Sequence, residues 1–106
     1  MKEQKRRRQI LQEIAAIETM EKGRLTEEYR ERVVNGKNRR LGPYFKYQRW
    51  EDGRNLSRRV PVPEVPGLRE AVENYHRFEA LSQEYADLTI AMTRQSGQDS
   101  KKKPRS

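Results

Sequence analysis

The residues whose types and spacing suggest chemistry lie between Tyr44 and Val60, in the stretch YFKYQRWEDGRNLSRRV. Aromatic, basic and amide side chains alternate there around an Asp-Gly turn. Amide side chains pair with base edges, arginine and lysine bind phosphate or guanine, and aromatic rings stack on unpaired bases. The pattern therefore predicts a surface that binds nucleic acid, and its exact contacts depend on how the strands pair.

Residues suited to catalysis are scarce. His76 is the only histidine, the chain has no cysteine, and Ser57 has no base in its own motif. General acid–base catalysis and metal binding both need several such groups together, and no phosphate-binding loop or carboxylate pair is visible. We therefore expect a protein that is not an enzyme and that uses no cofactor and no metal.

The charge balance favours a polyanionic partner. The 106 residues include 24 Lys and Arg but only 16 Asp and Glu, a net charge of +8. Residues 61–93 are net acidic by four charges, so the rest of the chain carries an excess of +12. Such an uneven basic charge is the electrostatic footprint of a nucleic-acid binder, although solubility alone also favours charge.

Composition also predicts where the protein is found. The absence of cysteine fits a reducing compartment. The N-terminus lacks the apolar core of a signal peptide, and no run of 18 apolar residues occurs. We expect a cytoplasmic protein that does not bind a membrane.

A first helix is predicted over residues 2–21, within an N-terminal segment 1–22. Ile10 and Ile14 belong to an apolar stripe with helical spacing, and Gly23 follows as a stop signal. The basic run at residues 5–8 lies on the first turns, where the helix dipole disfavours cations. It is expected either to contact phosphate or to form a solvated helix end.

A three-stranded antiparallel meander is predicted over residues 24–60. The dipeptides Asn35-Gly36 and Asp52-Gly53 are strong signals for two-residue hairpin turns. The first strand is the ambiguous one, since TEEYRER also suits a helical turn. The predicted strands are residues 26–34, 41–50 and 54–60, with Pro43 at a strand start or edge.

The remaining chain predicts a second helix. Three prolines in residues 61–66 indicate a stiff, extended connection, and apolar spacing indicates a helix over residues 67–93. Its heptad-like seam could pair with a second copy or with a partner helix. Residues 94–106 form a basic tail predicted to be disordered. The fold class is therefore α+β, a single small αβββα domain over residues 1–93 with both helices packed against one sheet face.

Strand register decides which side chains are free. A two-residue loop at Asp52-Gly53 pairs Glu51 with Arg54 and Phe45 with Val60. The face expected to cover the helices then holds Phe45, Tyr47, Arg49, Leu56, Arg58 and Val60. The opposite face holds Tyr44, Lys46, Gln48, Trp50, Asn55, Ser57 and Arg59. A one-residue slip would instead place Trp50, Leu56, Tyr44 and Val60 together, and both Trp50 and Tyr44 could equally be core aromatics.

Ten residues are predicted to contact nucleic acid: Lys37, Arg39, Arg40, Lys46, Gln48, Trp50, Arg54, Asn55, Ser57 and Arg59. Those near the turns are expected to bind phosphates and those on the strands to read base edges in a major groove. Duplex DNA is favoured as the partner. RNA, bound through stacking on Trp50 and Tyr44, is the first alternative, and a helix-mediated protein adaptor is the second.

Three short motifs carry a resemblance to a known family: Gly42-Pro43-Tyr44, Gly53-Arg54 and Ser57–Pro61, followed by the long helix. Over roughly residues 24–93 the chain resembles an uncharacterised prokaryotic family of short proteins that are associated with mobile elements and sometimes labelled transposase-related. The resemblance implies the αβββα fold and a link to a mobile element. Many members carry a cysteine-rich stretch before the GPYY-like strand, whereas VVNGKNRR has none, so no metal site is implied here.

The hairpin alone is also similar to the three-stranded DNA-binding domains of tyrosine recombinases. That similarity concerns the aromatic strand, the Asp-Gly turn and the arginine-rich return strand. Hairpins are common, so this similarity is an analogy at the level of one hairpin.

Overall fold

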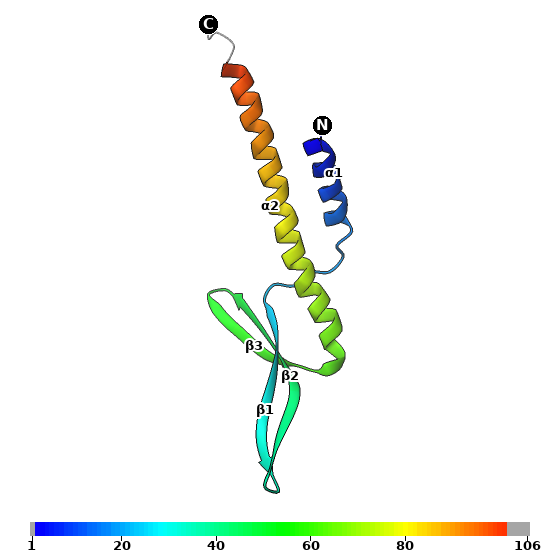
Figure 1. The fold of residues 1–106 in the computed structure, drawn as a ribbon, viewed down its shortest axis with the longest axis vertical. Helices are drawn as coiled ribbons and strands as arrows, with labels where there is room; N and C mark the ends of the chain where they lie inside the picture. Colours follow the sequence, from blue (N-terminus) through cyan, green and yellow to red (C-terminus); the bar gives the residue numbers. More distant parts are fainter. Residues whose placement is uncertain (1, 102–106) are drawn as a thin grey trace. The chain divides into compact units, whose positions relative to one another are not determined.

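A computed structural model describes residues 2–101, and the side chains of residues 2–97. It shows the predicted α+β order of one helix, three antiparallel strands and a long helix (Figure 1). The elements are α1 (Lys2–Ala15), β1 (Arg24–Val34), β2 (Lys37–Glu51), β3 (Arg54–Val60), η1 (Val62–Glu64) and α2 (Val65–Lys101). The doubtful first strand is thus a strand, and β3 has the predicted bounds.

Contacts divide the chain into two compact units, and α2 contributes to both. The first unit contains α1 and the part of α2 from His76 onward; the second contains residues 19–75. Each unit buries its own apolar side chains, Ile10 and Leu81 in the first, and Phe45 and Val72 among those of the second.

α1 is shorter than predicted, because it ends at Ala15 instead of residue 21. The amide of Ile17 still bonds to the Ile14 carbonyl at 3.0 Å, and the chain then leaves the helix. Within the second unit the Glu21 amide donates to the Ala71 carbonyl at 3.0 Å. Backbone groups that bond to a neighbouring element in this way no longer need helical partners.

The connection after the sheet is also different from the prediction. Residues 61–66 are not extended: η1 follows Pro61 directly, and α2 already begins at Val65. Proline has no N–H group, and the first turn of a helix needs none, so Pro66 is compatible with the start of α2.

The second helix was predicted to end at residue 93, whereas α2 continues to Lys101. Residues 94–101 have helix-favouring Arg and Gln side chains, and no proline occurs between Pro66 and Pro104. The prediction for residues 102–106 lies outside the described residues.

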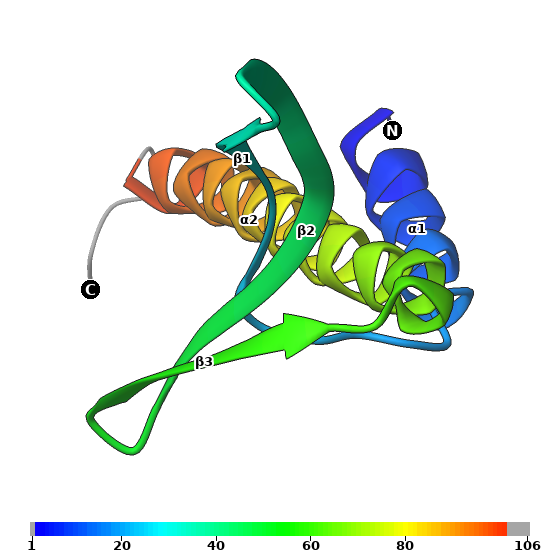
Figure 2. The same cartoon turned by 90° about the horizontal axis from the view of Figure 1, so that it is seen from below.

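The sheet has the strand order β1-β2-β3, with both pairs antiparallel. β2 pairs with β3 as predicted, Phe45 with Val60 and Glu51 with Arg54, so the slipped register is wrong. Because β3 ends opposite Phe45, the stretch of β2 before it pairs with β1 alone. Figure 2 shows how strongly β2 curves between its two hairpin turns.

The core of the second unit lies on one face of this sheet. Phe45, Tyr47 and Val60 are buried there against Val65 and Val72 of α2. The Tyr47 hydroxyl donates to the Lys22 carbonyl, and burial together with nearby Glu21 raises the pKa of this tyrosine. Leu56 was expected in this core, but it is 38% exposed because it pairs beside the Asp52-Gly53 turn, beyond the buried residues.

In this core, the described residues come from the sheet and from the first half of α2. α2 therefore covers this sheet face as expected. α1 instead packs with the second half of α2 in the other unit.

Candidate nucleic-acid interface

The sheet face opposite this core carries most of the predicted site. Strand register places three groups of side chains on it: Arg24, Thr26, Glu28, Arg30, Arg32 and Val34 from β1; Lys37, Arg39, Leu41, Tyr44, Lys46, Gln48 and Trp50 from β2; Asn55, Ser57 and Arg59 from β3. We call this set the cationic face. The other set, which includes the buried aromatics, is called the core face.

A β-bulge in β2 determines which arginines join the cationic face. Glu28 pairs with Tyr44 but Arg30 pairs with Leu41, so two residues of β2 lie opposite one residue of β1. An extra residue reverses the alternation of the side chains that precede it. The bulge therefore brings Lys37 and Arg39 to the same face as Tyr44.

The bulge also explains Pro43. It lies inside β2 on the stretch that β3 does not reach, so it occupies a strand edge, one of the two predicted positions. The preceding peptide bond is cis, and Gly42 has φ of 134°. A Cβ at Gly42 would lie 2.9 Å from the Glu28 carbonyl oxygen, so this position requires glycine.

The cationic face is not electrically balanced. It holds seven basic residues, Arg24, Arg30, Arg32, Lys37, Arg39, Lys46 and Arg59, and one acidic residue, Glu28. Among the described residues none of the seven forms an ion pair. Two cross-strand pairs place like charges directly opposite each other, Lys46 with Arg59 and Arg32 with Arg39, an arrangement that destabilises a sheet.

The core face pairs its charges instead. Glu31 lies opposite Arg40 and Glu51 lies opposite Arg54. Arg49 also bonds to Glu51 at 2.6 Å. Arg40 further stacks over the ring of Tyr29, 4.0 Å from its centre. Arg40 and Arg54 were both predicted to bind nucleic acid, and the structure places both on this other face.

Tyr44 organises the centre of the cationic face. The guanidinium carbon of Arg59 lies 4.9 Å from the centre of its ring, and that of Arg30 lies 5.3 Å from it. Stacking holds a guanidinium group in place while its N–H donors stay available for an anion. A hollow of about 270 Å³, lined also by Lys46 and Ser57, lies at this point.

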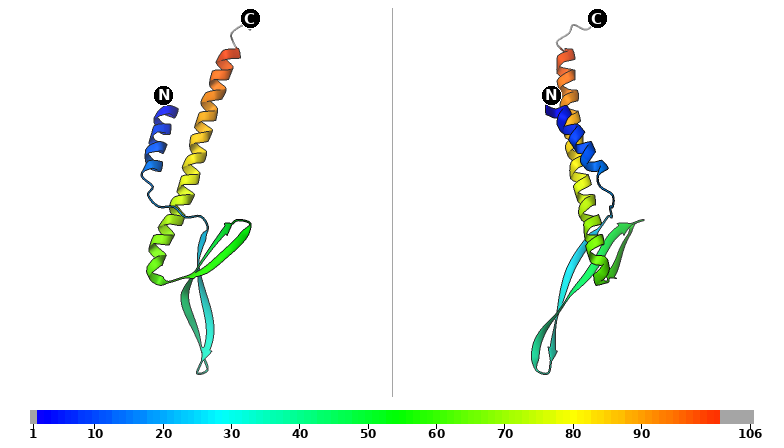
Figure 3. Two further views of the ribbon diagram at one scale, coloured as in Figure 1. Left: turned by 180° about the vertical axis from the view of Figure 1, so that it is seen from behind. Right: turned by 90° about the vertical axis from the view of Figure 1, so that its right-hand side faces the viewer.

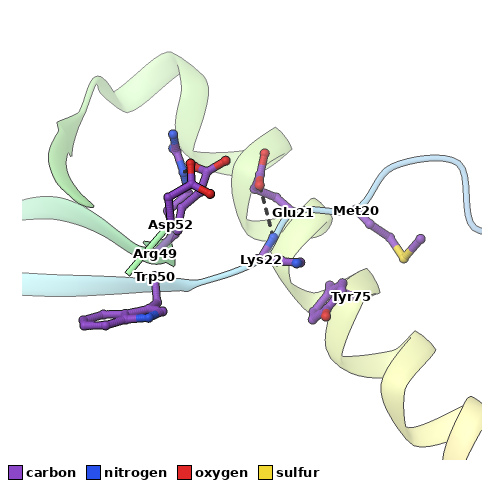
Figure 4. Close-up of a pocket in the computed structure, with 8 residues that line it drawn as sticks. Met20, Glu21, Lys22, Arg49, Trp50, Asp52 and Tyr75 are labelled. Carbon is purple, nitrogen blue, oxygen red and sulfur yellow. Dashed lines mark hydrogen bonds and ion pairs between the residues drawn. The ribbon is translucent and has the colours of Figure 1, made fainter. Parts of the chain in front are cut away.

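Trp50 marks the end of the same face near the second turn. It is 69% exposed, so the alternative that made it a core residue is wrong. Figure 4 shows Arg49 and Asp52 projecting to one side of the hairpin and Trp50 to the other. These residues line an open hollow of about 720 Å³ together with Met20, Glu21, Lys22, Glu51 and Tyr75.

The structure thus brings together eight of the ten predicted residues: Lys37, Arg39, Lys46, Gln48, Trp50, Asn55, Ser57 and Arg59. The prediction missed the contribution of β1, chiefly Arg24, Arg30 and Arg32. The turn at Asn35-Gly36 was a signal for two of them, since it pairs Arg32 with Arg39 and Arg30 with Leu41.

The basic run of α1 is partly used inside the first unit. Arg6 donates to both carboxylate oxygens of Glu84 at 2.7 and 2.8 Å, and it bonds to Glu13 at 3.1 Å. The hydrogen bond from Arg6 lowers the pKa of Glu84, and the same bond raises the pKa of Arg6. Arg7 lies over the Tyr85 ring and donates to its hydroxyl at 2.9 Å. Only Lys5 and Arg8 of this run are exposed for a phosphate.

Other kinds of site find little support in the described part of the chain. His76 lies 3.5 Å from Glu79, and no group of three or more potential metal-ligating side chains comes together among the residues described. No helix within residues 2–101 is both long and apolar enough to cross a membrane.

Comparisons with protein-family models, with curated proteins and with solved structures found no match to this chain. The resemblance to the mobile-element-associated family therefore stays a prediction from its motifs.

Proposed function

We propose that this protein is a small accessory protein that binds duplex DNA through the cationic face of its sheet. The observation that carries the proposal is that two cross-strand pairs place like charges opposite each other, Lys46 with Arg59 and Arg32 with Arg39. Each weakens the free sheet, and no carboxylate of the described residues neutralises them. A bound polyanion would remove this repulsion.

Duplex DNA is favoured over other polyanions by the shape and chemistry of the face. The major groove of B-form DNA admits a β-ribbon, whereas that of A-form RNA is too deep and narrow for side chains to read. Gln48 and Asn55 lie among the cations and supply amides that can read base edges. The motif resemblance adds an association with a mobile element to the proposal.

RNA with unpaired bases is the second candidate, and Trp50 is the observation that favours it. An exposed indole is a good stacking platform for a base. Tyr44 argues against this candidate, because two guanidinium groups already lie over its ring.

Fluorescence anisotropy with labelled duplex DNA, single-stranded DNA and hairpin RNA, each over a range of salt concentrations, tests the proposal. The variant Lys46→Gln/Arg59→Gln removes two charges from the cationic face. Its matched control, Arg40→Gln/Arg54→Gln, removes two charges from the core face. We expect the first variant to weaken duplex binding and to lower the salt slope by about 2, because each phosphate contact contributes about 0.9.

The control variant should bind nearly as the wild type does. Equal losses in the two variants would show that only net charge matters, and the cationic face would then not be the binding site. Preferred binding of unpaired RNA that depends on Trp50 would replace duplex DNA with the second candidate. No binding to any of the three ligands would direct attention to a protein partner for α2.

A further inference from the structure

The hairpin formed by β1 and β2 extends well beyond β3. β3 ends opposite Phe45, so residues 30–41 form a two-stranded arm (Figure 3). No side chain of this arm is buried, and only Val34 and Leu41 are half-buried. An isolated two-stranded hairpin is marginally stable in water, and this arm has no apolar core of its own.

The charges of the arm destabilise it further. It contains five basic residues, Arg30, Arg32, Lys37, Arg39 and Arg40, and one acidic residue, Glu31. Arg32 and Arg39 are direct cross-strand partners, so the arm carries one of the two like-charge pairs. Within the described part of the chain neither arginine forms an ion pair, so an anionic ligand would relieve this repulsion.

The arm and the body of the sheet present their cations on one continuous surface. Without the bulge at Gly42, Lys37 and Arg39 would lie on the core face. The glycine that the bulge requires thus aligns the arm with Lys46 and Arg59. Two separate ligands would not need this alignment.

We propose that the arm lies in a groove of the same duplex that the body of the sheet contacts, so that one protein covers about one helical turn. This inference rests on the proposed function. β1 has 11 residues, and ten steps of about 3.4 Å give a length of about 34 Å. One turn of duplex DNA is also about 34–36 Å long. A two-stranded ribbon fits the width of the major groove, which is about 12 Å.

The test compares wild type with two arm variants on duplexes of increasing length, about 6, 8, 10, 14 and 20 base pairs. One variant, Arg32→Gln/Arg39→Gln, removes the like-charge pair. The other replaces residues 31–40 by Asn-Gly, which joins the cross-strand partners Arg30 and Leu41 through a two-residue turn. The core-face variant Arg40→Gln/Arg54→Gln serves as the charge-matched control for the first.

For the wild type, affinity per site should rise with duplex length up to about 10 base pairs and then level off. Both arm variants should level off at a shorter duplex. Their salt slopes should fall by about 2 for the charge variant and by about 3 for the shortened arm, which loses Arg32, Lys37 and Arg39. The control should reproduce the wild-type length dependence.

The outcomes separate this inference from the proposed function. If Lys46→Gln/Arg59→Gln weakens binding but both arm variants match the wild type, the inference about the arm is overturned and the proposed function stands. If no variant changes binding, both fail. Circular dichroism identifies any variant that has lost its sheet, and the charge variant, which keeps every backbone pair, then decides the question alone.

Discussion

The two faces of one sheet follow opposite rules of charge placement. On the core face two cross-strand pairs place a carboxylate opposite an arginine, Glu31 with Arg40 and Glu51 with Arg54. On the cationic face like charges lie opposite each other. The same strands and turns build both faces, so backbone constraints cannot explain the difference. Folding stability accounts for the charge pairing on the core face, and we propose that an anionic ligand accounts for the unpaired cations on the other face.

The largest expected effect comes from the core face, at Phe45. Phe45→Ala should lower the free energy of unfolding by about 3–5 kcal/mol, since it empties part of a small core. Urea unfolding followed by circular dichroism measures it. Lys46→Gln, the neighbouring residue on the other face, is the control and should change the free energy of unfolding only slightly. Equal costs at the two positions would contradict the assignment of faces.

The bulge links the two faces, so its loss should affect both stability and binding. Gly42→Ala places a Cβ 2.9 Å from the Glu28 carbonyl oxygen at positive φ, which should cost about 1–3 kcal/mol of stability. Duplex affinity should fall as well, because the arm cations lose their alignment.

Gly36→Ala is the matched control for this substitution. Gly36 also has positive φ, but no atom lies within 4 Å of an added Cβ. Gly36→Ala should therefore lower stability through backbone strain in the turn, but it should reduce duplex affinity only slightly. A loss of affinity as large as that of Gly42→Ala would mean that general weakening of the hairpin, and not the alignment of the faces, controls binding.

Lys46→Glu should separate folding from binding most clearly. It converts the like-charge pair with Arg59 into an opposite-charge pair, which should stabilise the sheet by about 0.2–1 kcal/mol. Duplex binding should nevertheless be strongly reduced, since a phosphate contact becomes a repulsion. Urea titration and anisotropy on the same sample measure the two quantities. A destabilised variant would show that Lys46 has a structural role instead.

The smallest effect concerns the first unit, where Arg6 pairs with Glu84 and Glu13. The hydrogen bond from Arg6 lowers the pKa of Glu84 below its ordinary value of 4.5. The stabilisation by this pair is therefore complete above about pH 4.5 and is lost as the pH falls through the lower pKa of the folded state. Thermal melts of wild type and Glu84→Gln should differ at about pH 7 and converge as the pH falls below the ordinary carboxyl range.

Glu70→Gln, at an exposed position of α2, controls for the loss of a carboxylate as such. A difference between wild type and Glu84→Gln that does not change with pH would contradict the role of the Arg6–Glu84 pair.

Local signals in the sequence were sufficient for the strands, the turns and the register between β2 and β3. Asn35-Gly36 and Asp52-Gly53 both adopt the positive φ that a two-residue turn needs, and that backbone preference is local. Charge composition and the alternation of polar with apolar side chains are also local, so they placed Lys46, Gln48 and Arg59 together on one face.

Two features depended on the tertiary structure, because residues distant in the sequence offered the backbone other hydrogen-bond partners. α1 ends early because the Glu21 amide bonds to α2, a partner about fifty residues further along the chain. The bulge at Gly42 arises where β1 and β2 pair without β3, and it reverses the faces of Arg39 and Arg40. A one-residue change of alternation leaves no trace in composition or periodicity. The division of arginines between a neutralised face and an exposed face was therefore decided by long-range pairing.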